Sequence, residues 1–164
     1  MATKKFDKKL YDKADPLAKG AMVKWLQKNN YEFINPKETY GVDITCSKDG
    51  APYFFETEIK YGWKDVWPDR WLEIRIPYRK NEIIKKWMRD GSKGTLTFVI
   101  FRPDCEQSWF INGLIVGQSD VKVVRTKENV NDEKFFHINV NDANLINMGD
   151  IDAFNDIKNT KYPS

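Results

Sequence analysis

PYFFETEIK, residues 52–60, alternates apolar and polar side chains with the period of a β-strand. Successive side chains of a strand point to opposite faces of the sheet. The pattern therefore predicts a strand with one apolar face and one face that carries Glu56, Glu58 and Lys60. Three charged side chains on one face of a strand need an explanation.

The segment before this strand predicts its partner. SKDG (47–50) is a turn sequence, and VDITC (42–46) has the β-branched residues of a strand. Two strands joined by a short turn form an antiparallel hairpin. We therefore expect Asp43 to lie beside the charged face of the strand at 52–60.

The remaining pattern predicts a single mixed domain. A helix is expected with Asp15 as its N-cap and Pro16 at its first position, ending at Asn29-Asn30. TLTFVIF (95–101) is the longest apolar run and predicts a buried central strand. Further strands are expected at 31–35, 71–77, 109–113, 121–126 and 135–140, a second helix at 79–91, and a short helix after Asp150. This order indicates an α/β or α+β domain over 1–164, with 1–12 and 155–164 peripheral or frayed.

Composition limits the function classes. Hydrophobic residues make up 41% and aromatic residues 14% of the chain, which predicts a folded core. A net charge of +3 is too small to diagnose nucleic-acid binding, although the acidic stretch 31–59 lies between basic stretches. Two cysteines make no disulfide framework, and no apolar run is long enough for a membrane span. We therefore expect a soluble intracellular protein, in the cytoplasm or in the host cytoplasm if viral.

The usual nucleotide and zinc motifs are absent from the sequence, and His137 is its one histidine. The setting of this residue, FFHINV, favours a structural histidine over a catalytic one. The residues that remain are Asp43, Glu58 fifteen positions later, and Lys60. Two carboxylates on neighbouring strands suit Mg²⁺, with Mn²⁺ as a substitute, and a lysine on the same face can act on water or phosphate charge. The alternative is a solvated face with ordinary cross-strand ion pairs.

Gly41-Val42-Asp43, followed by a turn and Glu58-Ile59-Lys60, resembles the PD-(D/E)xK nuclease superfamily, which includes restriction endonucleases, Holliday-junction resolvases and phage nucleases. The order of elements over residues 13–102 is similar too. The resemblance implies a restriction-endonuclease-like central sheet flanked by helices. It also implies metal binding by Asp43, Glu58 and the backbone carbonyl of Ile59, with Lys60 serving the attacking water.

The sequence departs from the family pattern at two places. Val42 replaces the proline of the family name, and residues 16–29 contain no acid, although many members carry a glutamate in the first helix. Glu56 from the strand or Asp15 from the start of the helix could supply the missing carboxylate. An inactive member that binds nucleic acid or a protein partner is the alternative function.

Basic residues after the charged strand are candidates for phosphate contacts: Lys64, Arg75, Arg79 and Lys80. They lie near Trp63, Trp67 and Trp71, any of which could stack on an exposed base. The resemblance thus implies a small phage-type or resolvase-like DNA endonuclease that acts on branched or single-stranded DNA and is dimeric if it makes paired cuts. The sequence does not distinguish DNA from RNA.

Overall fold

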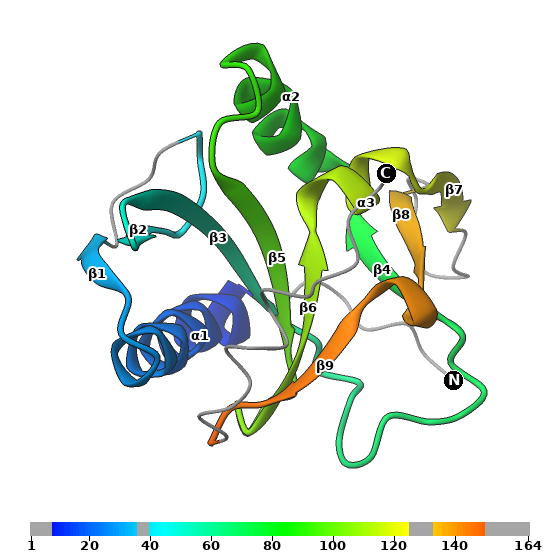
Figure 1. Ribbon diagram of the computed structural model, residues 1–164. Coiled ribbons are helices and arrows are strands. Elements are labelled where there is room, and N and C mark those ends of the chain that lie inside the picture. The colour runs from blue at the N-terminus through cyan, green and yellow to red at the C-terminus, as the bar shows by residue number, and fades with distance from the viewer. Residues whose placement is uncertain (1–7, 36–39, 125–132, 150–164) are drawn as a thin grey trace.

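A six-stranded sheet of mixed strand direction organises the computed structural model, which describes residues 8–35, 40–124 and 133–149 (Figure 1). Its strand order is β1-β2-β3-β5-β6-β9, and a second, antiparallel sheet has the order β4-β8-β7. The strands are β1 (Glu32–Asn35), β2 (Ile44–Lys48), β3 (Ala51–Ile59), β4 (Glu73–Pro77), β5 (Thr95–Phe101), β6 (Gln107–Asn112), β7 (Asp120–Val124), β8 (Glu133–Asn139) and β9 (Asn144–Asn147). The helices are α1 (Lys8–Lys28), α2 (Asn81–Arg89) and α3 (Gly113–Gln118), with 3-10 turns η1 (Tyr78–Lys80) and η2 (Val140–Asp142). The predicted fold class, a mixed central sheet flanked by helices, is confirmed.

The parallel pair β3 and β5 forms the centre of the large sheet. Every residue of β5 from Leu96 to Phe101 is buried, as its apolar sequence predicts. Parallel neighbours need a crossover connection. Here the crossover carries the 60–72 loop, β4, η1 and α2, so it returns the chain to the face of β3 that carries its acidic residues.

The predicted hairpin of β2 and β3 is present, with Lys48 opposite Ala51. Asp49 and Gly50 form its turn with φ angles of 52° and 80°. A two-residue hairpin turn with both φ angles positive matches the twist of the strands, and glycine adopts such an angle without a steric penalty. This turn fixes the register that places Ile44 opposite Phe55.

Two hydrophobic clusters cover the two faces of the large sheet. One cluster joins α1, through residues such as Met22 and Trp25, to Phe55 and Phe110. The other joins α2, α3 and the small sheet to the opposite face; its members include Ile74, Ile76, Ile84, Trp87, Phe98 and Phe136. Phe55 therefore points toward α1 whereas its neighbours in β3 point toward the second cluster, as the alternating sequence predicts.

Three local predictions are corrected. The first helix begins at Lys8 instead of Pro16, with Pro16 inside it; the missing N–H of proline removes one backbone hydrogen bond, which a helix of this length tolerates. Gly113 begins α3 instead of ending a strand, because the side chain of Asn112 accepts a hydrogen bond from the N–H of Leu114 at 2.8 Å. Strand β9 is additional to the predicted elements.

Other predictions fall on residues that lie outside those described. They concern residues 1–7, the turn at 36–39, residues 125–126 of an expected strand, and the tail from Asp150. In the part of the chain that the structure describes, no helix is long and apolar enough to cross a membrane.

Candidate functional site

Asp43 lies at the end of the β2–β3 ladder, just before the first residue of β2. Its N–H donates to the carbonyl of Phe55 at 3.1 Å. Its Oδ2 atom accepts hydrogen bonds from the N–H of Thr57 at 2.8 Å and from the Oγ1 of Thr57 at 2.9 Å. Lys19 of α1 approaches Oδ1 to 3.6 Å. Strand β3 itself therefore holds this carboxylate in place.

Asp43 lies one residue beyond Ile44–Phe55, the last pair of the β2–β3 ladder, and Glu56, the residue after Phe55 in β3, has a buried side chain. It forms an ion pair and hydrogen bond with Lys80 of η1, which is also buried. Burial raises the pKa of Glu56 to about 7; the charge of Lys80 opposes this shift and the neighbouring Asp43 carboxylate adds to it. A half-buried carboxylate, approached by Lys19, thus neighbours a buried one that is paired with Lys80.

Glu58 and Lys60 continue the same face of β3. Burial raises the pKa of Glu58, although the nearby charges of Lys80, Arg79 and Lys60 act in the opposite direction. Burial lowers the pKa of Lys60, a shift that Glu58 opposes. The Nζ atom of Lys60 lies 5.4 Å from the ring centre of Trp71. The predicted charged face is therefore a partly buried cluster, and the interpretation as a solvated face does not describe it.

Lys80 behaves as a member of this cluster. Its burial lowers the pKa of its ammonium group, but the carboxylates of Glu56 and Glu58 outweigh this effect and raise it. A buried charge is tolerated only when it is paired and hydrogen-bonded. The structure therefore places Lys80 in the interior, in contrast to the surface phosphate contact expected from the sequence.

The other expected phosphate contacts are exposed: Lys64 in the 60–72 loop, Arg75 on β4 and Arg79 in η1. Ile59, the residue whose carbonyl the resemblance implies as a ligand, packs its side chain against the α1 cluster. Asp15 belongs to a part of α1 whose side chains lie outside those described.

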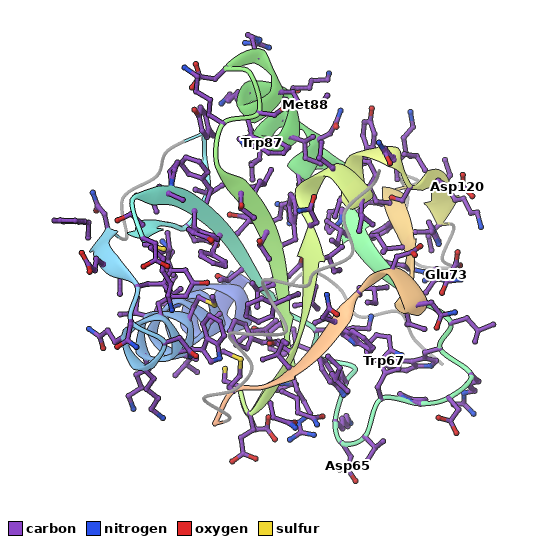
Figure 2. All side chains as sticks on the ribbon, in the orientation of Figure 1. Asp65, Trp67, Glu73, Trp87, Met88 and Asp120 are labelled. Atoms are coloured by element: carbon purple, nitrogen blue, oxygen red, sulfur yellow. The ribbon has the colours of Figure 1, made fainter. Side chains whose placement is uncertain are left out.

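A cavity of about 460 Å³ borders the cluster at Lys60. It is formed by the 60–72 loop and β4, and its lining is Lys60, Arg70, Trp71, Leu72, Glu73 and Arg75. Figure 2 shows Trp67 inside the wide loop that carries Asp65 at its tip. The lining combines three basic side chains with an aromatic ring, which suits an anionic ligand with a flat apolar part.

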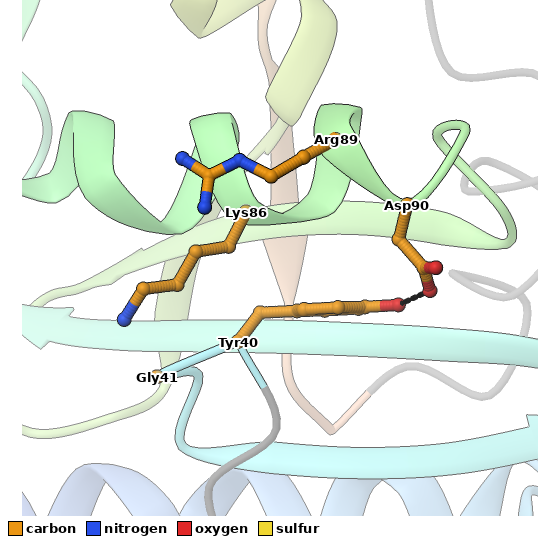
Figure 3. Close-up of a pocket in the computed structure, with 5 residues that line it drawn as sticks. All are labelled: Tyr40, Gly41, Lys86, Arg89 and Asp90. Atoms are coloured by element: carbon orange, nitrogen blue, oxygen red, sulfur yellow. Dashed lines mark hydrogen bonds between the residues drawn. The ribbon is translucent and has the colours of Figure 1, made fainter.

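A second, shallower cavity of about 500 Å³ lies between Tyr40 and α2. Figure 3 shows Lys86 and Arg89 on the side of the helix that faces Tyr40, whose hydroxyl donates to the carboxylate of Asp90. Gly41 also lines this cavity, two residues before Asp43. Basic side chains of α2 therefore line a cavity that reaches the backbone two residues before Asp43.

Asp43 and Glu56 supply the carboxylate oxygens that could bind Mg²⁺, the cation that the family resemblance implies. This ion usually takes one or two carboxylates and completes its shell with water and phosphate oxygens. Glu56 Oε1 is buried and has no hydrogen-bond partner among the described residues, so a ligand oxygen beside Asp43 is available. No group of three or more His, Cys, Asp or Glu side chains within the described ranges could hold a metal ion. Asp43 and Glu56 fit as a two-carboxylate site.

Sequence reasoning missed Lys80 and Lys19 as partners of the acidic residues. The helical spacing of Lys19 with Met22 signals a position near the buried side of α1. For Lys80, the sequence IPYRK contains only a weak signal, namely a lysine that follows a buried strand without a turn residue between them.

His137 lies on β8, away from the acidic cluster. It is buried, and its Nδ1 atom is 3.4 Å from Glu73 Oε1 on the neighbouring strand β4. This position on the small sheet supports the structural interpretation.

The fold and the site together define a mixed α+β protein with a buried carboxylate and lysine cluster at the edge of a hairpin. No protein-family model matches the chain, and no curated protein matches it in sequence. Among solved structures, the chain is similar to Hjc, a Holliday junction resolvase from the archaeal hyperthermophile Archaeoglobus fulgidus, at 12% identity and a TM-score of 0.44. The likeness covers 72% of this chain and 84% of that chain. A likeness at this level carries no argument about function.

Proposed function

We propose that the chain is a metal-dependent endonuclease that hydrolyses phosphodiester bonds in DNA. The observation that supports this most directly is the pair of neighbouring carboxylates, Asp43 and Glu56: burial and the Asp43 charge raise the pKa of Glu56 even though Lys80 is paired with it. Such an arrangement costs free energy in the protein alone, because like charges repel and burial disfavours the ionised form. A divalent cation would relieve both effects.

Asp43 and Glu56 would hold Mg²⁺ or Mn²⁺, with Glu58 close enough in sequence and on the same face to contribute when the ion is bound. The ion would supply an activated water and neutralise charge on the phosphate. In the reaction, the water oxygen bonds to phosphorus while the bond from phosphorus to one sugar oxygen breaks, and that oxygen gains a proton.

Lys60 is the residue that we assign to the attacking water and the developing phosphate charge. Its burial lowers the pKa of its ammonium group, so a larger fraction of the amine is neutral and able to accept a proton than in an exposed lysine. Arg79, which is exposed and whose charge acts on Glu58, would contact the phosphate backbone. Paired cuts in both strands would require two such sites, so a homodimer is part of the proposal.

The test uses purified protein with Mg²⁺ or Mn²⁺ on plasmid, single-stranded and branched DNA. We expect cleavage by the wild type, and loss of cleavage in Asp43→Asn and Glu56→Gln. Lys85→Ala is the matched control, because Lys85 is an exposed residue of α2 that pairs only with Glu82 among the described residues, at 3.8 Å. A well-folded sample that cuts none of these substrates would overturn the proposal.

A second candidate is a protein that keeps this fold and binds nucleic acid or a protein partner without cutting. The observation in its favour is Lys80, which already neutralises part of the carboxylate charge. Calorimetric titration separates the two functions: an active site takes up Mn²⁺ in the wild type and not in Asp43→Asn, whereas the second function predicts no uptake in either.

A further inference from the structure

The cavity beside Lys60 has features that the proposed cleavage chemistry does not use. Its aromatic side is Trp71, which is half-buried, and its rim includes Leu72, which is 63% exposed. A large apolar side chain at this exposure on a loop is more costly in water than a polar one. The loop between β3 and β4 therefore keeps an apolar surface open beside the candidate site.

Trp71 packs against Trp67. The indole N–H of Trp67 donates to the carbonyl of Trp71 at 2.8 Å. The two rings lie edge to face, with their centres 5.1 Å apart. Trp67 also lies edge to face with Trp63 and Trp109, at 5.2 Å and 5.5 Å between ring centres. Trp63 and Trp67 are buried, so the series of rings is anchored in the core. Trp71 is thus a preformed platform at the end of that series.

The charges around this platform favour an anion. Lys60, Arg70 and Arg75 line the cavity, and Glu73 is the acidic residue among its lining. Glu73 is already engaged, since its carboxylate oxygens lie 3.4 Å from His137 and 3.7 Å from Lys122. Both arginines are exposed, and neither forms an ion pair within the part of the chain that the structure describes. The cavity therefore offers positive charge and one aromatic face.

We propose that this cavity binds one unpaired nucleotide of the substrate, with its base stacked on Trp71 in place of the Lys60 ammonium group, which lies 5.4 Å from the ring centre, and with its phosphate held by Arg70 and Arg75. Bases inside a duplex are covered by their neighbours, so an aromatic platform can be used only by a single-stranded or unstacked base. Because Lys60 belongs to both the cavity and the candidate site, this nucleotide is adjacent to the cleaved bond. The proposal rests on the nuclease function and names its substrate class: DNA with a single-stranded segment next to the cut.

The test measures binding without cleavage, by fluorescence anisotropy of a labelled oligonucleotide of about 12 nucleotides in the presence of EDTA, a length within the usual site sizes. Trp71→Ala should weaken binding of single-stranded DNA by about 5- to 150-fold, the range expected for one stacked base, and Trp71→Phe should retain most of the affinity. Binding of blunt duplex should change less than twofold. Phe33→Ala is the matched control, because Phe33 is an aromatic residue of β1 that is 83% exposed.

Removing single bases from the oligonucleotide identifies the stacked position. One abasic position should lower the affinity of the wild type by the same factor as Trp71→Ala, and should lower that of Trp71→Ala no further. Equal single-strand affinity of Trp71→Ala, Trp71→Phe and wild type, with all three folded, would overturn the proposal while leaving cleavage intact. Failure of the nuclease function would show differently, as normal Trp71-dependent binding without cleavage in Mn²⁺.

Discussion

Replacing Lys80 with methionine removes the cation that contacts Glu56 and keeps a side chain of similar length in the core. In the wild type, the pKa of Glu56 rises from 4.5 to about 7. The folded state therefore binds this proton more tightly than the unfolded chain does. Stability consequently falls as the pH rises from about 4.5 to about 7, and stops falling above that value, where Glu56 is ionised in both states.

In Lys80→Met, Glu56 has no compensating cation, while burial and Asp43 still disfavour its ionised form. The folded variant should therefore keep its proton well above pH 7, as documented for buried glutamates with a pKa of roughly 8 to 9. Each further pH unit then costs about 1.4 kcal/mol of unfolding free energy that the wild type does not lose. Between pH 7 and pH 8.5 the variant should lose about 1 to 1.5 kcal/mol more than the wild type, in which Glu56 finishes its titration in the same range.

Urea unfolding followed by tryptophan fluorescence, with EDTA present, measures this difference. Glu56→Gln/Lys80→Met removes both groups of the pair and should abolish the extra pH dependence. Lys85→Met should follow the wild type, because Lys85 is mostly exposed and surface ion pairs contribute little. A Lys80→Met variant whose stability runs parallel to that of the wild type over this pH range would refute the buried pair and the reasoning built on it.

Three further predictions concern chemistry and packing. Lys60→Ala should bind Mn²⁺ and DNA normally yet cut at least about 100-fold more slowly in single-turnover assays, the range expected for a lost proton-transfer group; full activity would remove Lys60 from the mechanism. Mn²⁺ at about 100 times its Kd should raise the unfolding free energy of the wild type by about 2.7 kcal/mol, and an equal rise in Asp43→Asn would contradict the metal site. Burial raises the pKa of Cys46 to about 12, so a thiol reagent at pH 8 should label the partly exposed Cys105 first by mass spectrometry, and rapid labelling of Cys46 would contradict the packing of β2.

The elements that the sequence predicted are those with a strong local pattern. TLTFVIF contains no charged residue, and it forms strand β5, which is buried from Leu96 to Phe101. The segment 52–60 alternates, and SKDG supplies the positive φ angles of its turn, so the hairpin follows from local chemistry. These interactions lie between residues that are near in sequence, which is why pattern alone was sufficient.

The elements that were missed depend on distant contacts. Helix α3 has six residues, two of them glycine, and intrinsic propensity disfavours it. A Cβ atom at Gly113 would lie 2.7 Å from Leu96 Cδ2, so close packing on β5 determines the residue at this position. Strand β9 has four residues and is ordered by pairing with β6. The burial of Lys80 likewise depends on the crossover that brings η1 to β3.

The site shows the same division between local and distant information. Because a strand repeats every two residues, the alternation of ETEIK identifies the functional face but cannot say which of Glu56 and Glu58 meets Asp43. The family resemblance favours Glu58 as the metal ligand, whereas in the structure the Asp43 carboxylate lies close enough to Glu56 to add to the rise of its pKa. Glu56 therefore occupies the position from which a second carboxylate could replace the acid missing in the first helix. If Glu56 is that ligand, Glu56→Gln should weaken Mn²⁺ uptake at least as much as Glu58→Gln does. If Glu58 alone binds the ion, Glu58→Gln should have the larger effect. Calorimetric titration of the two variants with Mn²⁺ decides which glutamate is the ligand.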